Sequence, residues 1–330
     1  MIQTIKETDG LERIAHFLTE NDGYILICHI SPDGDTIGSA LALYNTLKVY
    51  GKKVQICCYD RVPYSLLFLP GANEILHPDK TVTDETAIAV DCADLGRLGK
   101  CQRLFDAAKY TISIDHHGTN TMFAMQNEVF PKCAATAEIM YELIRIFAGT
   151  ISQEVANCLY TGLMTDTGGF SFSNVTAQTF AIASELVRFG ANPWKANQNV
   201  YRTVPLAKSR LLGFALSSSI LYHEGQTVLS VITQADMARV KAKADDSEGI
   251  IDHLRDIEGV EVAIVLRECL DGEYKISMRS KDYIDVALIC NNFGGGGHER
   301  AAGAKSSMQL DKLTDLVLSA VKEAYEEADY

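Results

Sequence analysis

Three short apolar runs in this chain end directly in histidine and aspartate residues, and this pattern constrains the fold more than any other feature. The runs cover residues 24–28, 87–90 and 110–114, and each is predicted to be a buried strand. They are followed by His29-Ile30-Ser31-Pro32-Asp33-Gly34-Asp35, by Asp91 and by Asp115-His116-His117. Because the carboxyl ends of parallel strands line one crevice, these His and Asp side chains are expected to converge on a single cleft.

Strand and helix patterns alternate from residue 24 to about residue 189. A further strand is predicted at 53–58, and helices are predicted at 36–49, 134–147, 152–165 and 176–189. This alternation predicts an α/β fold with a mostly parallel sheet and helices on both faces of that sheet.

The rest of the chain has a different pattern, and 330 residues suffice for two domains. A turn-forming segment, Gly190-Ala191-Asn192-Pro193-Trp194, ends the last of these helices. From residue 211 the pattern is α+β, with strands predicted at 228–232, 260–267 and 274–279 and helices at 249–257, 285–291 and 310–324. We therefore expect one domain at 1–189, a linker or hinge at 190–209, and a smaller α+β domain at 210–330.

The converging His and Asp residues have the composition of a metal site. Asp33 and Asp35 flank Gly34 on a loop, so they can point to opposite sides and serve different ions. The alternative is structural, with Asp35 capping a helix and His29 lying in the core. Three strand ends and one helix end, at Asp166, all carry His or Asp, which favours the metal site.

The predicted ligands are imidazoles and carboxylates without sulfur. This set favours Mn²⁺, with Mg²⁺, Co²⁺ or Fe²⁺ as alternatives, over a structural zinc ion. Two such ions typically lie about 3.5–4 Å apart and clamp the attacking and leaving oxygens of a phosphoryl displacement. We expect Asp91 to bridge the two ions, since its strand would be central in the sheet.

At these residues the chain resembles the DHH phosphoesterase superfamily, which is named for the Asp-His-His sequence found here at Asp115 to His117. The other motifs of that family are matched by HISPDGD at 29–35, by Asp91 within VDCAD and by Asp166 within TGLMTDTGGF. The segment GGGGHERAAGA at 294–304 is similar to the signature of the DHH-associated C-terminal domain. The resemblance therefore implies a DHH catalytic domain at 1–189 and a substrate-binding domain at 210–330.

The resemblance also implies roles for individual residues. The first ion would be bound by His29, Asp33 and Asp91, and the second by Asp35, Asp91, His116 and Asp166. A hydroxide between the two ions would attack phosphorus, because both charges lower its pKa. Asp91 and His117 are the predicted catalytic residues, and His117 is expected to contact the phosphate or protonate the leaving oxygen.

Substrate-binding residues are predicted in both domains. Four lie in the glycine-rich segment: Gly295, Gly296, Gly297 and His298. Successive glycine N–H groups can form an anion-binding nest, although a flexible turn is the alternative. Arg279 resembles an arginine that this C-terminal domain directs at substrate phosphate, and a solvated charge at a strand end is its alternative. Arg97 resembles an arginine near the cleft of small nucleotide-cleaving members.

The charge and the apolar content of the chain limit the kinds of partner that it can bind. A net charge of −13 argues against binding of long duplex nucleic acid, which requires many Lys and Arg contacts. No apolar stretch is long enough to cross a membrane, and the first seven residues have no signal-peptide pattern, so we expect a cytoplasmic protein without membrane contact. The nine cysteines include no C-x-x-C pair and are expected to be reduced. The sequence leaves the oligomeric state open, a homodimer included.

The size and the glycine-rich signature resemble the oligoribonuclease and 3′-phosphoadenosine-5′-phosphate (pAp) phosphatase branch of the family. That resemblance implies hydrolysis of RNA of about two to five nucleotides to mononucleotides, and of pAp to AMP, and such short substrates need few phosphate contacts. A cyclic or linear dinucleotide phosphodiesterase is an alternative with the same residues. An alternative of another class is a catalytically silent nucleotide-binding regulatory protein on this scaffold.

Overall fold

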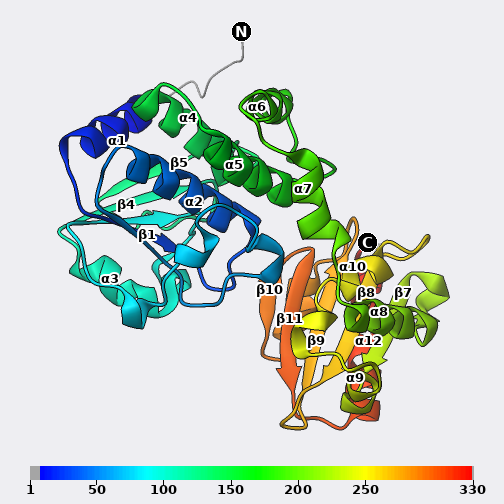
Figure 1. Ribbon diagram of the computed structural model, residues 1–330. Coiled ribbons are helices and arrows are strands. Elements are labelled where there is room, and N and C mark those ends of the chain that lie inside the picture. Colours follow the sequence, from blue (N-terminus) through cyan, green and yellow to red (C-terminus); the bar gives the residue numbers. More distant parts are fainter. Residues whose placement is uncertain (1–7, 329–330) are drawn as a thin grey trace. The chain divides into compact units, whose positions relative to one another are not determined.

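The computed structural model describes residues 8–328 of the chain (Figure 1). The first seven residues, in which no signal-peptide pattern was found, lie outside the described residues. Contacts divide the chain into two units, Met1–Thr203 and Val204–Tyr330. The segment expected to be a linker is helical in part: α7 (Pro193–Asn197) and the π-helical turn η5 (Gln198–Arg202) belong to the first unit.

The first unit is built on a parallel five-stranded sheet. Its strands are β1 (Tyr24–Cys28), β2 (Val54–Cys57), β3 (Thr86–Val90), β4 (Tyr110–Asp115) and β5 (Gln126–Val129). They lie in the order β2-β1-β3-β4-β5, and every neighbouring pair is parallel. The chain therefore changes direction across the sheet between β1 and β3. Such a switch point, at the carboxyl ends of the strands, is where open α/β sheets bind ligands.

Helices cover both faces of this sheet, as the alternating pattern predicted (Figure 1). The helices are α1 (Asp9–Glu20), α2 (Gly34–Val49), α3 (Gln102–Ala107), α4 (Thr136–Ala148), α5 (Gln153–Asp166) and α6 (Ala177–Arg188). Alternate residues of β1 face the two cores. Leu26 packs with α1, α2, α4 and α5, whereas Ile25 packs with α3 and the preceding 3₁₀ segment η4 (Leu95–Cys101).

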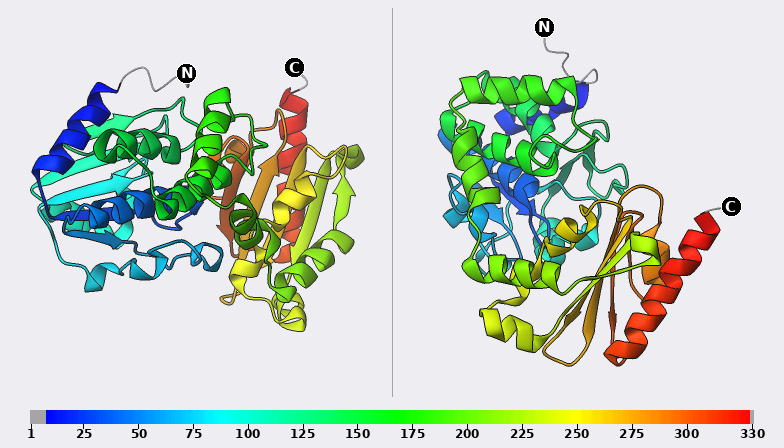
Figure 2. Two further views of the ribbon diagram at one scale, coloured as in Figure 1. Left: turned by 45° about the horizontal axis from the view of Figure 1, so that its top comes forward. Right: turned by 90° about the vertical axis from the view of Figure 1, so that its right-hand side faces the viewer.

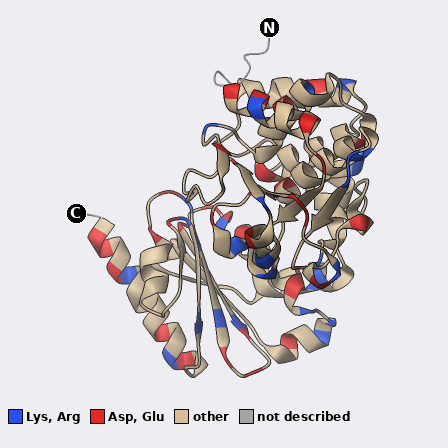
Figure 3. Cartoon of the chain, turned by 90° about the vertical axis from the view of Figure 1, so that its left-hand side faces the viewer, with Lys and Arg blue, Asp and Glu red and all other residues tan. Residues whose placement is uncertain are grey.

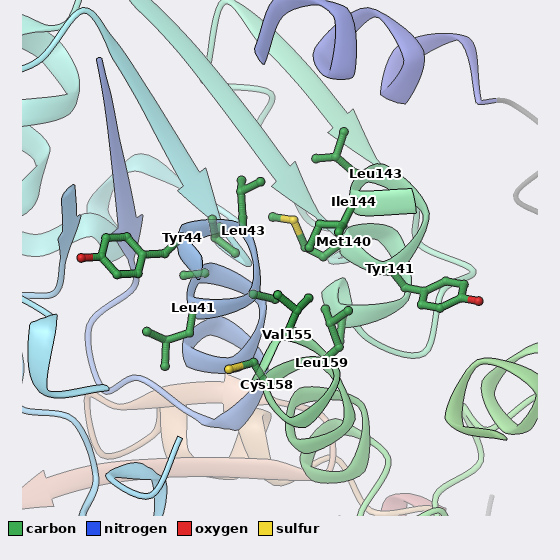
Figure 4. Packing of buried hydrophobic residues seen from close by; sticks show 14 of the residues in the cluster. Leu41, Leu43, Tyr44, Met140, Tyr141, Leu143, Ile144, Val155, Cys158 and Leu159 are labelled. Carbon is green, nitrogen blue, oxygen red and sulfur yellow. The ribbon is translucent and has the colours of Figure 1, made fainter. Parts of the chain in front are cut away.

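The helices on the first face pack closely enough to bring distant motifs together. Figure 4 shows Leu43 of α2, Met140 of α4 and Val155 of α5 in one buried cluster. A β-carbon on Gly38 of α2 would lie 2.5 Å from the carbonyl oxygen of Cys158 on α5, so only glycine permits this approach. The contact sets the start of α2 beside the end of α5, which joins the first and last predicted metal-binding motifs.

The second unit is built on a mixed six-stranded sheet of order β10-β11-β9-β8-β7-β6. Its strands are β6 (Ile220–Tyr222), β7 (Thr227–Ile232), β8 (Val262–Glu268), β9 (Tyr274–Ser280), β10 (Gly296–His298) and β11 (Ala301–Ser306). Its helices are α8 (Leu206–Ser217), α9 (Gln234–Val240), α10 (Ile250–Arg255), α11 (Val286–Asn291) and α12 (Leu310–Ala328). The helices α11 and α12 cover one face and α8 to α10 the other (Figure 2). The smaller α+β domain expected from the sequence has this architecture.

The charged residues and the cysteines can now be placed in the structure. Lys and Arg positions are interspersed with Asp and Glu on the helices of both units in the view of Figure 3. All nine cysteines are free, and seven of them are buried. Within residues 8–328, none of the helices combines the length and the apolar character required for a membrane span.

Candidate metal centre and phosphate-binding residues

The predicted ligands of the first unit are placed by the ends of its strands. His29 directly follows β1, and Asp91 directly follows β3, so the two residues flank the switch point of the sheet. The backbone of Asp91 has a φ of 59°, a conformation that is costly for a residue other than glycine and that is often found at functional sites. Its N–H donates to the carbonyl of Ile114 at 2.9 Å, which holds this turn against β4.

Three groups of side chains are each compact enough to hold a metal ion, with ligand atoms within 4.8 Å of one another. They are His29, Asp33 and Asp91; Asp35, His116 and Asp166; and Asp91, His116 and His117. Every residue predicted to be a metal ligand occurs in one of these groups. The structure thus brings together side chains that are up to 137 positions apart in the sequence, from His29 to Asp166 (166 − 29).

Asp91 belongs to two of these groups. Its Oδ2 is 3.7 Å from Nε2 of His29, and its Oδ1 is 3.6 Å from Nε2 of His116. Nε2 of His116 is also 3.3 Å from Oδ2 of Asp166. The two oxygens of one carboxylate therefore face different groups, which is the arrangement expected of a bridging ligand.

The electrostatics of these groups fit the binding of cations. Asp35 and Asp91 are almost entirely buried, at 0% and 2% exposure. Burial raises the pKa of Asp35 well above its usual range, and the charges of Asp91 and Asp166 raise it further. Burial also raises the pKa of Asp166 to about 6. Bound divalent cations would remove the repulsion among these carboxylates, and the oxygen and nitrogen donor set suits such ions.

Asp33 and Asp35 have distinct structural roles. Asp33, and not Asp35, caps α2, because its Oδ1 accepts hydrogen bonds from the N–H groups of Asp35 and Thr36 at 3.0 Å each. The structural alternative considered for Asp35 is therefore wrong. Asp35 instead accepts hydrogen bonds from the first N–H groups of α4, those of Thr136 and Ala137, at 2.6 and 2.9 Å.

Backbone carbonyls orient the two predicted histidine ligands. Nδ1 of His116 is 3.2 Å from the carbonyl oxygen of Cys133, and Nδ1 of His29 is 2.7 Å from that of Ile30. A ring that donates from Nδ1 presents the lone pair of Nε2, which in both residues faces the carboxylates. Sequence reasoning missed these partners, since a carbonyl group gives no signal in the side-chain pattern.

Asp115 does not belong to any of the three groups within the described chain. It is fully buried, and its Oδ1 lies 2.7 Å from Nδ1 of His117. Its Oδ2 accepts a hydrogen bond of 2.7 Å from Asn120, a residue that sequence reasoning missed. The hydrogen bond to Asp115 raises the pKa of His117 above its ordinary value. Asp115 thus fixes the orientation of His117 and leaves Nε2 of His117 available to another group.

Arg97 also lies at this centre. Its guanidinium Nη2 is 3.0 Å from Nδ1 of His29, which is a contact without a hydrogen bond in the tautomer whose Nδ1 donates to Ile30. The backbone supports this position, because the N–H of Ile30 donates to the carbonyl of Arg97 at 2.8 Å and Asp94 caps the segment that carries it. The structure therefore brings this predicted substrate-binding residue next to a predicted metal ligand.

In the second unit, Arg279 and His298 lie on the same face of the sheet. Each is paired with Ala301 on the strand between them, and directly paired residues of neighbouring strands point to the same side. Ala301 places only a methyl group between the side chains of Arg279 and His298 on this face. Nε of Arg279 is 3.6 Å from Oδ1 of Asp252 on α10.

The glycine-rich segment has a different geometry from the predicted nest. The N–H groups of Gly294 and Gly295 donate to the carbonyls of Asn291 and Cys290, so they end α11 and are not available to an anion. Gly296, Gly297 and His298 form the edge strand β10. A β-carbon on Gly295 or Gly297 would collide with the backbone of β11. Gly295 and Gly297 are therefore required for the packing of this segment against β11, independently of any role in binding.

The first unit is a parallel α/β domain with groups of His and Asp side chains at the switch point of its sheet, and an α+β domain follows it in the chain. These are features of a metal-dependent phosphoesterase. Residues 24–163 match the DHH family, N-terminal domain, and residues 226–327 match the DHHA1 domain. A Thermus thermophilus protein named bifunctional oligoribonuclease and PAP phosphatase NrnA is 33% identical over 325 residues, which cover 98% of this chain and 96% of that protein. The chain belongs to the DHH family of phosphoesterases and is a metal-dependent hydrolase.

Two further similarities bear on fold and function. A Bacteroides fragilis protein described as exopolyphosphatase-related has a solved structure that matches this one with a TM-score of 0.92 at 27% identity, covering 98% of both chains. A cyclic-di-AMP phosphodiesterase, PdeA of Listeria monocytogenes, is 23% identical over 94% of this chain but only 49% of its own length.

Proposed function

We propose that this enzyme uses Mn²⁺ to hydrolyse very short RNA to mononucleotides, and that it also converts pAp to AMP. The observation that carries the proposal is the position of Asp91, with one carboxylate oxygen facing His29 and the other facing His116. The name of the Thermus thermophilus relative supports the substrate class. The silent binding protein considered from the sequence is not supported, because the chain is a member of a hydrolase family.

The proposed mechanism assigns roles to the residues of the first unit. One ion would be held by His29, Asp33 and Asp91, and the other by Asp35, Asp91, His116 and Asp166. Two Mn²⁺ ions would supply a water of lowered pKa and neutralise charge on the phosphoryl group. His117, which is held at Nδ1 by Asp115, donates a proton from Nε2 to the leaving oxygen.

The second unit is proposed to bind the remainder of the substrate, with 1–189 as the catalytic domain and 190–209 as a hinge. Arg279 and His298 share a face with only an alanine between them, and a guanidinium group suits bidentate binding of phosphate. Arg97 would meet substrate at the metal centre. Gly295, Gly296 and Gly297 would let the substrate approach the backbone near His298. A cytoplasmic location remains a prediction.

The test is Mn²⁺-dependent turnover of a substrate panel, with products separated by chromatography. The panel contains a 5′-phosphorylated RNA dinucleotide, a five-mer, a twenty-four-mer, pAp, cyclic di-AMP and pyrophosphate. We expect turnover of the dinucleotide, the five-mer and pAp, little turnover of the long RNA, and loss of activity with EDTA. Activity confined to the twenty-four-mer or to pyrophosphate would contradict the proposal.

A second candidate is hydrolysis of cyclic or linear dinucleotides, which the name of the Listeria monocytogenes relative favours. The same panel separates the two candidates. Rapid turnover of cyclic di-AMP, without turnover of the five-mer or pAp, would assign the enzyme to this second activity.

A further inference from the structure

Thr136, the first residue of α4, contacts two of the predicted metal-binding carboxylates. Its backbone N–H donates to Oδ2 of Asp35 at 2.6 Å, and its hydroxyl donates to Oδ1 of Asp91 at 2.8 Å. The residue is fully buried. No sequence motif marked it, and it is not one of the His, Asp or Glu residues from which such sites are inferred.

We propose that Thr136 is a positioning residue, which holds Asp35 and Asp91 in the mutual arrangement that lets the centre bind two ions. The inference rests on the proposed function, because it assumes that these carboxylates are metal ligands. Asp35 belongs to the group with His116 and Asp166, whereas Asp91 belongs both to the group with His29 and to the group with His116 and His117. Thr136 therefore fixes the two carboxylates, Asp35 and Asp91, relative to each other.

The two contacts of Thr136 are not equally replaceable. Asp35 has two other hydrogen-bond donors, the N–H of Ala137 at 2.9 Å and the hydroxyl of Ser39 at 3.0 Å. The carboxylate of Asp91 has no such additional donors. Within residues 8–328, the hydroxyl of Thr136 is the only group that donates a hydrogen bond to it, and the histidine rings nearby lie farther away, at 3.6–3.7 Å. Loss of the hydroxyl therefore acts mainly on Asp91.

The orientation of the Asp91 carboxylate decides which groups its oxygens face. With Oδ1 held by Thr136 and directed to His116, Oδ2 is directed to His29. A carboxylate without this hydrogen bond can rotate about its terminal torsion, which is broad and roughly two-fold. Partners that orient metal ligands typically change metal affinity by roughly 10- to 100-fold when they are removed. We expect an effect of this size on binding of the ions.

Three variants of the full-length chain test the proposal. Thr136→Val removes the hydroxyl but keeps the branched shape and the backbone N–H. Thr136→Ser restores a hydroxyl at the same position. Thr161→Val is the matched control, because Thr161 is also fully buried in a helix but its hydroxyl donates to a backbone carbonyl, that of Asn157, at 2.8 Å.

The measurement is Mn²⁺ binding to metal-free protein, by titration calorimetry and by the electron paramagnetic resonance of free Mn²⁺, without substrate. We expect Thr136→Val to weaken binding by roughly 10-fold or more, and Thr136→Ser and Thr161→Val to bind like the wild type. At saturating Mn²⁺, KM should be unchanged in all three. Thermal unfolding of each metal-free variant verifies its fold, and Thr136→Ala against Thr136→Ser provides the same comparison should the valine variant not fold.

Two results would overturn the inference while leaving the proposed function intact: wild-type affinity in Thr136→Val, or an equal loss in Thr161→Val. Absence of Mn²⁺ binding by the wild type would overturn both. Because the titration contains no substrate, failure of the substrate assignment would leave the binding data unaffected.

Discussion

Asp91 combines three properties that a single residue seldom has: burial, a positive φ and a carboxylate whose two oxygens face different groups. Asn tolerates the positive φ and keeps the shape, so Asp91→Asn removes the negative charge and replaces one of the two carboxylate oxygens by an NH₂ group, which cannot bind a metal ion. We expect turnover with Mn²⁺ to fall by roughly 10³-fold or more. The melting temperature of the metal-free protein should not fall, because a buried charge is removed. Asp106→Asn, at an exposed position, is the control, and near-normal turnover in Asp91→Asn would exclude the bridging role.

Glu142 on α4 is a buried acid outside the metal centre. It is 4% exposed, and its Oε1 has no hydrogen-bond partner. Burial raises the pKa of this carboxyl above its ordinary value of 4.5. Between the ordinary and the raised pKa, the unfolded chain ionises before the folded chain does, so the free energy of unfolding falls as the pH rises through this window.

Glu142→Gln replaces the ionisable carboxyl by a neutral amide, so the free energy of unfolding no longer falls with the ionisation of this residue. We expect the variant to be more stable than the wild type at pH 7.5, by about 1 kcal/mol, and the difference to disappear at pH 4. Urea unfolding in EDTA at both pH values measures the effect, and Glu154→Gln, at an exposed position, is the control. A difference that is the same at both pH values would show that ionisation of Glu142 does not contribute.

At the scale of elements, the apolar strands of the first unit could be predicted because they are buried on both faces, and their ends then placed the His and Asp residues. The strand β5, with the sequence Gln-Asn-Glu-Val, could not be predicted because it is a half-buried edge strand without an apolar run. The helix α1 also went unpredicted. The sequence could not show that the N–H groups of Gly294 and Gly295 are unavailable to an anion-binding nest, because they donate to carbonyls at the end of α11. Thr136 and Asn120 act through neighbours that only the folded chain supplies.

The helix α10 places a negative charge beside the predicted phosphate-binding arginine. Asp252 lies 3.6 Å from Arg279 and 3.2 Å from Arg255. A phosphate that approaches Arg279 must therefore compete with this carboxylate. We expect Asp252→Asn to lower KM for the RNA dinucleotide about two- to fivefold, with kcat unchanged, since partly exposed ion pairs are weak.

Steady-state kinetics at constant ionic strength measure this effect. Asp256→Asn is the matched control, because Asp256 pairs with Arg255 and not with Arg279 in the described structure. A higher KM in Asp252→Asn would mean that Asp252 holds Arg279 in a productive position and does not compete with substrate.

At the scale of the whole molecule, each unit has hydrophobic cores of its own, and every residue of the three groups lies in the first unit. Domains with separate cores generally unfold as separate cooperative units. A ligand that binds only the folded form of one unit should stabilise that unit alone. Calorimetry can therefore locate the metal site without any substrate.

We expect two unfolding transitions in EDTA, and Mn²⁺ should raise the temperature of one of them. At an ion concentration about 100 times the Kd, the stabilisation is about 2.7 kcal/mol. For a unit of this size, it corresponds to roughly 5–10 °C. Asp91→Asn should abolish the shift and leave the other transition unchanged. A cation held by the residues at the ends of β1 and β3 can stabilise only the unit that contains those strands. If Mn²⁺ raised both transition temperatures equally in the wild type, or raised one of them in Asp91→Asn, the ions would therefore bind outside this centre.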